Sequence, residues 1–592
     1  MASSLTSSSS DKPFYAFESD NRSSQWKPSR FFVVGAGFVL TAIIASALSL
    51  GVASNGRSTK PSSHRPSTES PSSSENNAVP MVEILAACNA TRFPEACSSS
   101  LAVPNLVPPN PSPLDIIQAS LLVSSQNIRK AQTALMSVVA DALPNRNLSV
   151  VVKVCLEVLD YSQLRLGQAN ESLSEGETKN SRAWMSASLS YVYDCAKGLR
   201  FYTNETTRLN STLSCLDNAV NITGNALSMV VSYYLYANNT SAWTPPQTER
   251  DGFWETNSTT ANPTFTGGLP SSFKVNAMVC KDDDKAMGCF KTVQEAVDSA
   301  PSNLSDSRFT IHIVEGVYEE IVRVPFDKKN LVFIGDGMNK TIISGSRSVS
   351  QPGITTYDSA TVGVLGDGFM AINLTFRNTA GSAAHQAVAF RSDSDQSVIE
   401  NCEFLGNQDT LYAHSLRQYY KSCRIQGNID FIFGNAAAVF ENCLILISPT
   451  ASDPKQPENG VICASGRIDP AQSTGFVFLN SSINGTQDYL ILHNSSSSLS
   501  SSYLGRPWKE FARTVYINCQ IGEVISPQGW MPWSGDFALN SLYFGENGNS
   551  GIGSNVSQRV QWSSQIGNEY VHAYSVQNFI QGDEWIPSVN KF

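Results

Sequence analysis

Two aspartates in the C-terminal half of the chain have types and spacing that could do chemistry as a pair. Asp409 lies in GNQDTLY, and Asp430 lies in GNIDFIFG, at a spacing of 21. Two neighbouring carboxyl groups resist joint ionisation, so one keeps its proton while the other is an anion. That split supplies a proton donor and a nucleophile from identical side chains. Gln408, and Gln386 at a spacing of 22 before it, add two amide groups.

A repeated pattern of short strands predicts how these residues are brought together. From residue 269, segments such as FTIHIVEGVY and MAINLTFRNTAG, rich in Val, Ile, Phe and Thr, alternate with turns of Asn, Gly and Asp. One motif recurs as NCEF, SCRI, NCLI, NSSI and NCQI, and Cys402, Cys423 and Cys443 within it have spacings of 21 and 20. This period predicts a β-solenoid in which each coil adds one strand to each parallel sheet.

In such a solenoid, residues one coil apart lie side by side, about 4.8 Å from each other across neighbouring strands. The spacing of Asp409 and Asp430 matches one coil and therefore predicts that they are neighbours on one sheet face. Gln408 and Gln386 would extend this polar group over three consecutive coils. Such a cluster is costly unless its members are hydrogen-bonded to one another or to a ligand.

The motifs GNQDTLY, GNIDFIFGNAAAVFENC, HQAVAFR, YLGRPWK and FIQGDEWIP resemble those of the plant pectin methylesterases. The similarity covers almost all of residues 269–592. It implies an all-β, right-handed parallel β-helix that hydrolyses the methyl esters of cell-wall homogalacturonan. It also implies that Asp430 is the nucleophile, that Asp409 is the proton donor and later the base, and that Gln408 and Gln386 stabilise the oxyanion.

The same resemblance implies the substrate contacts. Arg506 of LGRPWK would pair with the nucleophile, Trp508 would stack on a sugar, and Thr356 and Gln386 would contact the substrate. No metal or other cofactor is needed, because two acids and the amide donors supply every role. The acidic run KDDDKAMG lacks the ligand spacing of a calcium loop and is interpreted as a solvated loop.

Two other functions remain open at this point. A galacturonan glycoside hydrolase would share the solenoid and the paired acids. A non-catalytic protein would use the solenoid to bind the cell wall and another part of the chain to bind an esterase. The Gln-Asp pairing and LGRPW favour the esterase, and the net charge of −10 argues against a nucleic-acid partner.

Residues 80–235 have a helical pattern and predict an up-down bundle. CNATRFPEAC resembles the start of the invertase and pectin methylesterase inhibitor family. The resemblance implies an all-α four-helix bundle with disulfides Cys88–Cys97 and Cys155–Cys195 and a free Cys215. It further implies restraint of the catalytic domain by the bundle, and separate proteinaceous pectinesterase inhibitors as partners.

Seven cysteines follow residue 269, so at least one of them should lack a partner. Cys280 and Cys289 are candidates for one disulfide; Cys402 and Cys423 are further disulfide candidates, and the pairing within this region is left open. The linker before this region has no dibasic pair of the kind at which this family is often processed, which leaves removal of the bundle open.

The N-terminal region predicts the location of the protein. An uncharged run at 31–53 is long enough to span a bilayer, and basic residues before it favour a cytosolic N-terminus. Sixteen glycosylation sequons follow the run and fit the secretory pathway, ending at the cell wall. A late-cleaved signal peptide is the alternative to a signal anchor. The predicted order is a cytosolic tail (1–30), an anchor (31–53), a Ser/Pro linker (54–79), the bundle (80–235), a second linker (236–268) and the catalytic domain (269–592).

Overall fold

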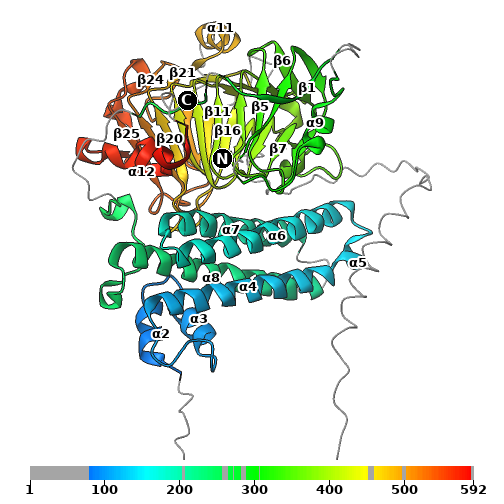
Figure 1. Ribbon diagram of the computed structural model, residues 1–592. Coiled ribbons are helices and arrows are strands. Elements are labelled where there is room, and N and C mark those ends of the chain that lie inside the picture. Colours follow the sequence, from blue (N-terminus) through cyan, green and yellow to red (C-terminus); the bar gives the residue numbers. More distant parts are fainter. Residues whose placement is uncertain are drawn as a thin grey trace, which may run out of the picture. The chain divides into compact units, whose positions relative to one another are not determined.

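The computed structural model describes residues 79–592, except 203–206, 256–264, 271, 282–287, 306, 451–458, 496–501 and 588–592. All described residues belong to one compact unit, in which a helical part is followed along the chain by a β-solenoid (Figure 1). No helix among them is long and apolar enough to cross a membrane. The predicted anchor at 31–53 lies outside the described residues.

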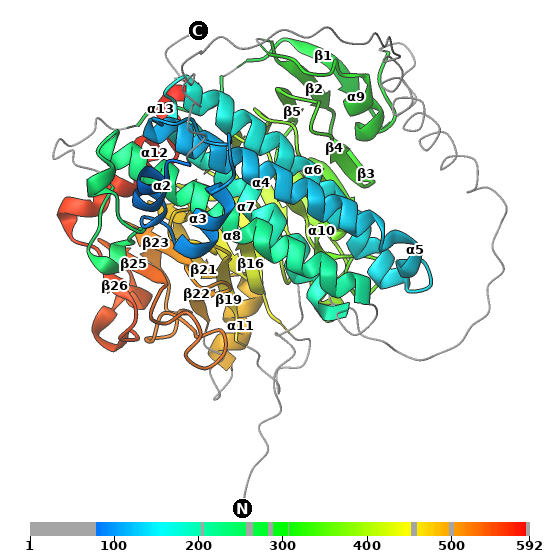
Figure 2. The same ribbon diagram turned by 90° about the horizontal axis from the view of Figure 1, so that it is seen from below.

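The helical part is built on four long helices that lie alongside one another in both views (Figures 1 and 2): α4 (Pro113–Met136), α6 (Arg146–Ser174), α7 (Thr178–Leu199) and α8 (Thr207–Tyr236). The sequence sets where α4 begins. Ser112 accepts a hydrogen bond from the Asp115 N–H, and the Asp115 carboxylate accepts one from the Ser112 N–H, which forms a capping box.

A short hairpin of α2 (Met81–Cys88) and α3 (Pro94–Leu101) precedes the four helices and is closed by the disulfide Cys88–Cys97. The disulfide Cys155–Cys195 joins α6 to α7. The structure thus forms both disulfides that the inhibitor resemblance implies, and Cys215 is free. Short helices complete this part: α5 (Val139–Ala142), η2 (Arg200–Tyr202), η3 (Thr240–Ala242) and η4 (Glu249–Asp251).

The solenoid consists of three sheets in which every paired strand is parallel. The first sheet has the order β1 (Val275–Val279), β2 (Phe309–Ile313), β5 (Leu331–Gly335), β8 (Met370–Ile372), β11 (Ser397–Glu400), β14 (Arg417–Lys421), β17 (Ala437–Glu441), β20 (Gly475–Leu479), β23 (Arg513–Ile517), β25 (Tyr543–Asn547) and β26 (Ser564–Gln565). The second, which carries the candidate site, has the order β22 (Tyr503–Pro507), β19 (Val461–Ser465), β16 (Ile429–Gly434), β13 (Leu411–Ala413), β10 (Phe390–Ser392), β7 (Val362–Val364) and β4 (Val322–Val324).

The third sheet has the order β24 (Gln520–Ile521), β21 (Ser482–Gly485), β18 (Leu444–Ile447), β15 (Arg424–Gly427), β12 (Glu403–Leu405), β9 (Thr375–Asn378), β6 (Thr341–Gly345) and β3 (Gly316–Glu319). Helices accompany the coils and close the chain: α9 (Val293–Ser299), α10 (Thr356–Ser359), η5 (Ser382–Ala384), α11 (Gln487–Ser495), η6 (Ile552–Ser554), η7 (Val556–Gln558), η8 (Asn568–Tyr574), α12 (Val576–Ile580) and α13 (Gly582–Trp585). The chain therefore forms the predicted all-β parallel β-helix after an all-α bundle.

The recurring sequence motif marks one corner of each coil. Its first residue has a positive φ between 49° and 54° in five coils: Asn401, Ser422, Asn442, Asn480 and Asn518. Asparagine tolerates this left-handed conformation better than most residues, which explains its repetition. The residue that follows the corner turns into the core, where Cys402, Cys423 and Cys443 are buried.

Inside the solenoid, equivalent side chains of successive coils stack on one another. Tyr420, Phe440, Phe478 and Tyr516 are aligned by strand register, with ring centroids 4.8, 4.8 and 4.4 Å apart. Such a ladder of aromatic contacts favours one register over its alternatives, because a slip of one residue would turn every ring to the outer face.

One of the two disulfides expected within the solenoid is formed and the other is not. Cys280 and Cys289 are bonded, whereas the expectation for Cys402 and Cys423 is wrong, since both are free thiols. Each instead donates a hydrogen bond to a backbone carbonyl, Cys402 to Glu400 and Cys423 to Ile399. Backbone carbonyls of the same coil, for Cys402, and of the preceding coil, for Cys423, thus satisfy these thiols without a bond between them.

Candidate active site

A buried ion pair joins two strands of the second sheet. Arg506 on β22 donates from Nε to Oδ1 of Asp430 on β16 at 2.8 Å, and from Nη2 to Oδ2 at 2.6 Å. Both side chains are almost fully buried. The Trp533 ring lies against the guanidinium, 4.3 Å from the ring centroid to Cζ. This two-bonded geometry fixes the Asp430 carboxylate in one orientation.

Asp409 lies one coil before Asp430 and differs from it electrostatically. Its N–H donates to the carbonyl of Ile429 at 3.1 Å, so the chain segments around the two aspartates are adjacent. Burial, and then the charge of Asp430, raise the pKa of Asp409 well above its usual range, and only Arg506 opposes this shift. The site therefore pairs a protonated acid with a carboxylate held by arginine.

The backbone is unusual at both aspartates. Asp409 has φ of 62° and Asp430 has φ of 49°. Left-handed backbone in residues other than glycine costs free energy and concentrates at functional sites. The same local conformation in two successive coils turns both carboxyl groups toward one place on the sheet.

Gln408 and Gln386, the two amides predicted to join the aspartates, extend the polar site over the preceding coils. The Gln408 carbonyl accepts from the Ala387 N–H, which follows Gln386, and the Gln386 carbonyl accepts from the Val349 N–H. Both glutamine side chains are only half-buried. Gln386, the Gln408–Asp409 pair and Asp430 are thus carried by three consecutive coils, with amide groups available to a ligand.

A row of aromatic and cationic side chains lies next to the aspartates. Strand register aligns Arg391, Tyr412, Phe433, Ala464 and Arg506 across the second sheet. The rings of Tyr412 and Phe433 are stacked with centroids 4.2 Å apart. Trp508 lies edge-on to Phe433 at 6.0 Å and is half-buried. Stacked aromatic faces beside a polar site suit the apolar faces of sugar rings.

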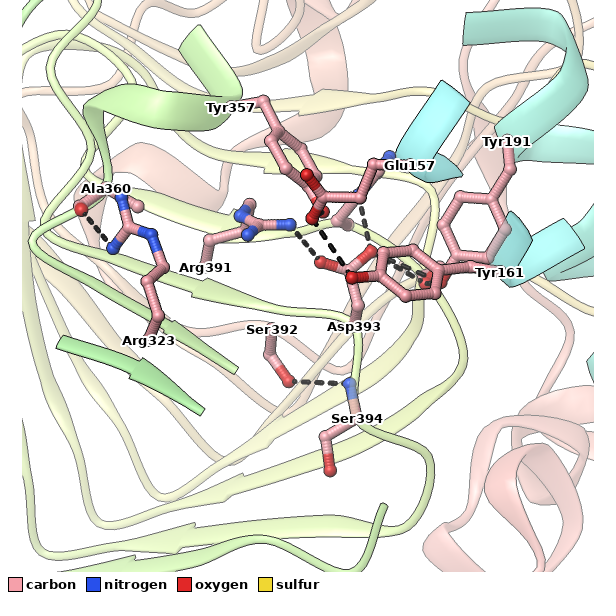
Figure 3. A network of polar contacts seen from close by, with 12 residues as sticks. Glu157, Tyr161, Tyr191, Arg323, Tyr357, Ala360, Arg391, Ser392, Asp393 and Ser394 are labelled. Atoms are coloured by element: carbon pink, nitrogen blue, oxygen red, sulfur yellow. Dashed lines mark hydrogen bonds and ion pairs between the residues drawn. The ribbon is translucent and has the colours of Figure 1, made fainter. Parts of the chain in front are cut away.

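Thr356 lies at a different end of this row. It is the first residue of α10 and is 4 % exposed. The next residue, Tyr357, lies over the Arg391 guanidinium, 3.3 Å from Cζ to the ring centroid (Figure 3). The structure therefore places Thr356 on α10, directly before the residue whose ring covers Arg391.

Sequence reasoning missed several residues of the row. Tyr412 and Phe433 are separated by one coil, the same period that singled out Asp409 and Asp430, and they lie in the same two motifs. The coil period could therefore have identified them. Arg391 precedes Tyr412 by the same 21 residues and lies in HQAVAFR, so the coil period could have identified it as well. No comparable signal marked Tyr357, whose place depends on contacts made outside its own coil.

The bundle contacts this same face of the solenoid. Tyr412 and Phe433 belong to the hydrophobic core that the bundle helices form. In Figure 3, Glu157 and Tyr161 of α6 and Tyr191 of α7 meet the solenoid side chains. Glu157 accepts hydrogen bonds from the hydroxyl groups of Tyr161 at 3.0 Å and of Tyr357 at 3.4 Å.

Charged pairs reinforce this contact. Arg165 of α6 donates to both carboxylate oxygens of Asp367 at 2.7 Å. His414 of the solenoid lies between Asp393 and the bundle's Asp194, at 2.6 and 2.9 Å. Burial lowers the pKa of His414, but the two aspartates outweigh it and raise this pKa to about 9, so the imidazole is a cation.

The segment after α8 binds both parts. Glu255 accepts from both terminal nitrogens of Arg182 on α7, at 2.7 and 2.8 Å. Arg513 of β23 donates to Glu249 at 2.6 Å. The Trp254 ring stacks on Tyr570 near the C-terminus at 4.2 Å. Residues 249–255 therefore connect the bundle to the far end of the solenoid.

The fold and the site together define a class: a β-helical enzyme that acts on carboxyl groups of a polysaccharide, joined to a helical inhibitor-like domain. The sequence model of the family Pectinesterase matches residues 276–583, and that of the family Plant invertase/pectin methylesterase inhibitor matches 83–229. The chain belongs to the pectinesterase family and carries an inhibitor-type domain before the enzyme domain.

Individual relatives agree with this assignment. The "Probable pectinesterase/pectinesterase inhibitor 64" of Arabidopsis thaliana is 54% identical over 514 residues, which are 85% of this chain and 84% of the relative. "Pectinesterase 2" of Citrus sinensis is 37% identical over 512 residues, or 86% of this chain and 94% of the relative. The solved structure of pectin methylesterase from carrot matches with a TM-score of 0.50 and 44% sequence identity. The match covers 54% of this chain and 97% of the carrot chain.

Proposed function

We propose that this enzyme removes methyl groups from pectin through a covalent intermediate on Asp430, with Asp409 moving the protons. The observation that carries the proposal is the Asp430 carboxylate, held in a buried two-bonded pair by Arg506 beside an acid whose pKa is raised. One anionic and one protonated carboxyl group within one site are what nucleophilic ester cleavage requires.

The proposed reaction has two steps. The Asp430 carboxylate attacks the carbonyl of a galacturonate methyl ester, and the amides of Gln408 and Gln386 donate hydrogen bonds to the oxyanion. Methanol leaves with the proton of Asp409, and an anhydride with Asp430 remains. Asp409, now a carboxylate, takes a proton from water, which attacks the anhydride and frees the galacturonate and Asp430. In this scheme Arg506 orients the nucleophile and Trp508 supports a sugar ring.

Asp430→Asn tests the nucleophile. The substitution keeps the shape but removes the charge, so methanol release from highly methylated pectin should fall by at least about 10³-fold, as when an essential nucleophile is lost. Reducing ends measured in the same samples separate the alternatives. Release of reducing ends without methanol would identify a glycoside hydrolase. Release of neither product would identify a non-catalytic, wall-binding protein.

The fragment 269–592 is suitable for this assay. The main core of the solenoid contains no residue of the bundle. The solved carrot enzyme matches 54% of this chain over 97% of its own length, so a folded protein of about the size of this fragment exists. A matched control is Asp488→Asn on α11, an aspartate outside the site. It should leave methanol release unchanged.

The bundle is proposed to restrain this activity in the intact chain. Its contacts with Tyr412, Phe433 and Tyr357 occupy the surface where a polysaccharide would lie. Separate inhibitor proteins would compete for the same surface. Adding the isolated bundle to the 269–592 fragment should lower methanol release, and unchanged release would argue against restraint.

The uncharged run at 31–53 and the sequons after it support a signal anchor and delivery of the enzyme to the cell wall. In that arrangement the enzyme stays membrane-bound until the chain is processed. Protease treatment of sealed microsomes should leave residues 79–592 protected and glycosylated. Digestion of this region in sealed vesicles would contradict the proposed topology.

A further inference from the structure

The loop that carries Gln386 leaves the third sheet after β9 and enters the second sheet at β10. One buried side chain at the start of this loop, Asn378, contacts both of its ends. The Asn378 amide donates to the carbonyls of Arg347 at 2.9 Å and of Val388 at 3.0 Å, and its oxygen accepts from the Ala380 N–H at 3.0 Å. Asn378 therefore ties the loop closed two residues after Gln386.

Hydrogen bonds to neighbouring coils also fix the backbone at Gln386 itself. The Gln386 carbonyl accepts from the Val349 N–H at 3.1 Å, and the Ala387 N–H donates to the Gln408 carbonyl at 3.2 Å. Val388, the next residue along, is fully buried. Because Gln386 lies outside any strand, these bonds, rather than the ladder of a sheet, set the direction in which its side chain leaves the backbone.

The residue directly before Gln386 has a costly backbone conformation. His385 has φ of 58° and ψ of −141°, a combination that glycine adopts freely and that other residues keep only where the surrounding structure enforces it. Within the described part of the chain, no side-chain hydrogen bond or ion pair of His385 accounts for this conformation. The bonds on either side of it, at Asn378 and at Gln386, do so. The strain at His385 is thus a consequence of holding Gln386 in one place.

We propose that Asn378 is a positioning residue for the esterase reaction and holds the Gln386 amide where the oxyanion forms. The inference rests on the proposed function, in which Gln386 donates to the oxyanion, and adds the residue that fixes this donor. Asn378 does not touch the substrate in this arrangement, since it is 4 % exposed and its amide is bonded to main-chain carbonyls. An oxyanion donor acts in the transition state, so a displaced Gln386 lowers kcat and leaves KM nearly unchanged.

A double-mutant cycle on the 269–592 fragment tests this role through methanol release from highly methylated pectin. Gln386→Ala should lower kcat by about 10²-fold or more, as the loss of one oxyanion donor does. Asn378→Ala should lower kcat at least about tenfold, the effect of a small misplacement, with KM within about twofold of wild type. In the presence of Gln386→Ala, the substitution of Asn378 should have no further effect on kcat, because the group that it positions is then absent.

Asn547→Ala is the matched control for Asn378→Ala. Asn547 ends β25 as Asn378 ends β9, and its amide also donates to a main-chain carbonyl, that of Ile566 at 2.7 Å. The control variant should keep the wild-type kcat. Thermal unfolding of each variant confirms that the fragments compared are folded.

An unchanged kcat in Asn378→Ala would overturn the inference and make Asn378 purely structural. The same conclusion would follow if Asn378→Ala lowered kcat equally with and without Gln386→Ala. An unchanged kcat in Gln386→Ala would reject the proposed role of Gln386 and the inference with it. Absence of methanol from wild type would instead reject the proposed function as a whole.

A second variant, His385→Gly, tests the strain without removing a hydrogen bond. Glycine adopts the conformation of His385 freely, so the midpoint of urea unfolding of the fragment should rise above the wild-type value. A midpoint equal to or below that of wild type would show that the loop is not held under strain and would also overturn the inference.

Discussion

At the residue scale, one arginine separates two identical and similarly buried side chains into two roles. Asp430 is held by the Arg506 guanidinium, whereas burial and the nearby Asp430 charge raise the pKa of Asp409. The difference lies in the environment, since both residues have the same left-handed backbone. A carboxyl group that keeps its proton in the folded state also makes stability depend on pH.

Asp409→Asn should remove that dependence. A raised pKa means that the folded state binds more protons than the unfolded state. Wild-type stability therefore falls as pH rises from the usual aspartate pKa toward the raised one, by at most about 1.4 kcal/mol per pH unit. The variant lacks this loss, so the difference in free energy of unfolding, variant minus wild type, should increase between pH 5 and pH 7. Methanol release by the variant should be abolished. Urea unfolding of both proteins at pH 5 and pH 7 measures this difference. A difference that is the same at both pH values would contradict the raised pKa of Asp409.

At the element scale, the solenoid depends on a corner that recurs in successive coils. Asn401, Asn442, Asn480 and Asn518 all have a positive φ, between 49° and 54°, and the aromatic ladder inside the sheet depends on the register that these corners set. The same corners keep the site aligned, because the strands that carry site residues follow them along the coil.

Asn442→Ala should lower the free energy of unfolding by roughly 1–2 kcal/mol, because alanine resists the left-handed conformation. Asn442→Gly, which adopts it freely, should stay within about 1 kcal/mol of wild type. Urea unfolding of the 269–592 fragment provides the measurement. If alanine and glycine had the same effect, the asparagine would matter for its side chain and not for its backbone.

At the scale of the whole molecule, the inhibitor-type domain and the enzyme domain share buried charges. Arg165 is 1 % exposed and is held by Asp367, which is distant from it in sequence. The segment 249–255 adds ion pairs to both parts. Cutting the chain after this segment would leave these contacts in place, so release of the bundle needs more than one broken peptide bond.

Arg165→Ala should increase methanol release by the full-length chain toward that of the 269–592 fragment. Breaking a buried ion pair costs about 3–5 kcal/mol, which is enough to raise a small displaced population of the bundle by about a hundredfold or more. Arg129→Ala, on an exposed face of α4, is the matched control and should have no effect. If intact wild type already matched the fragment, the bundle would not be a restraint.

The sequence by itself determined the solenoid, the bundle and the neighbouring positions of the two aspartates. The coil period is a local repeat, and a spacing of one period places side chains next to each other whatever surrounds them. The Asp409 N–H bond to Ile429 agrees with that spacing.

Only the tertiary structure decided that Cys402 and Cys423 stay unbonded and that the bundle contacts Tyr412, Phe433 and Lys509. Tyr193 and Lys509, like Arg165 and Asp367, are far apart along the chain. No sequence period links them, because their contacts arise where two separately folded surfaces meet.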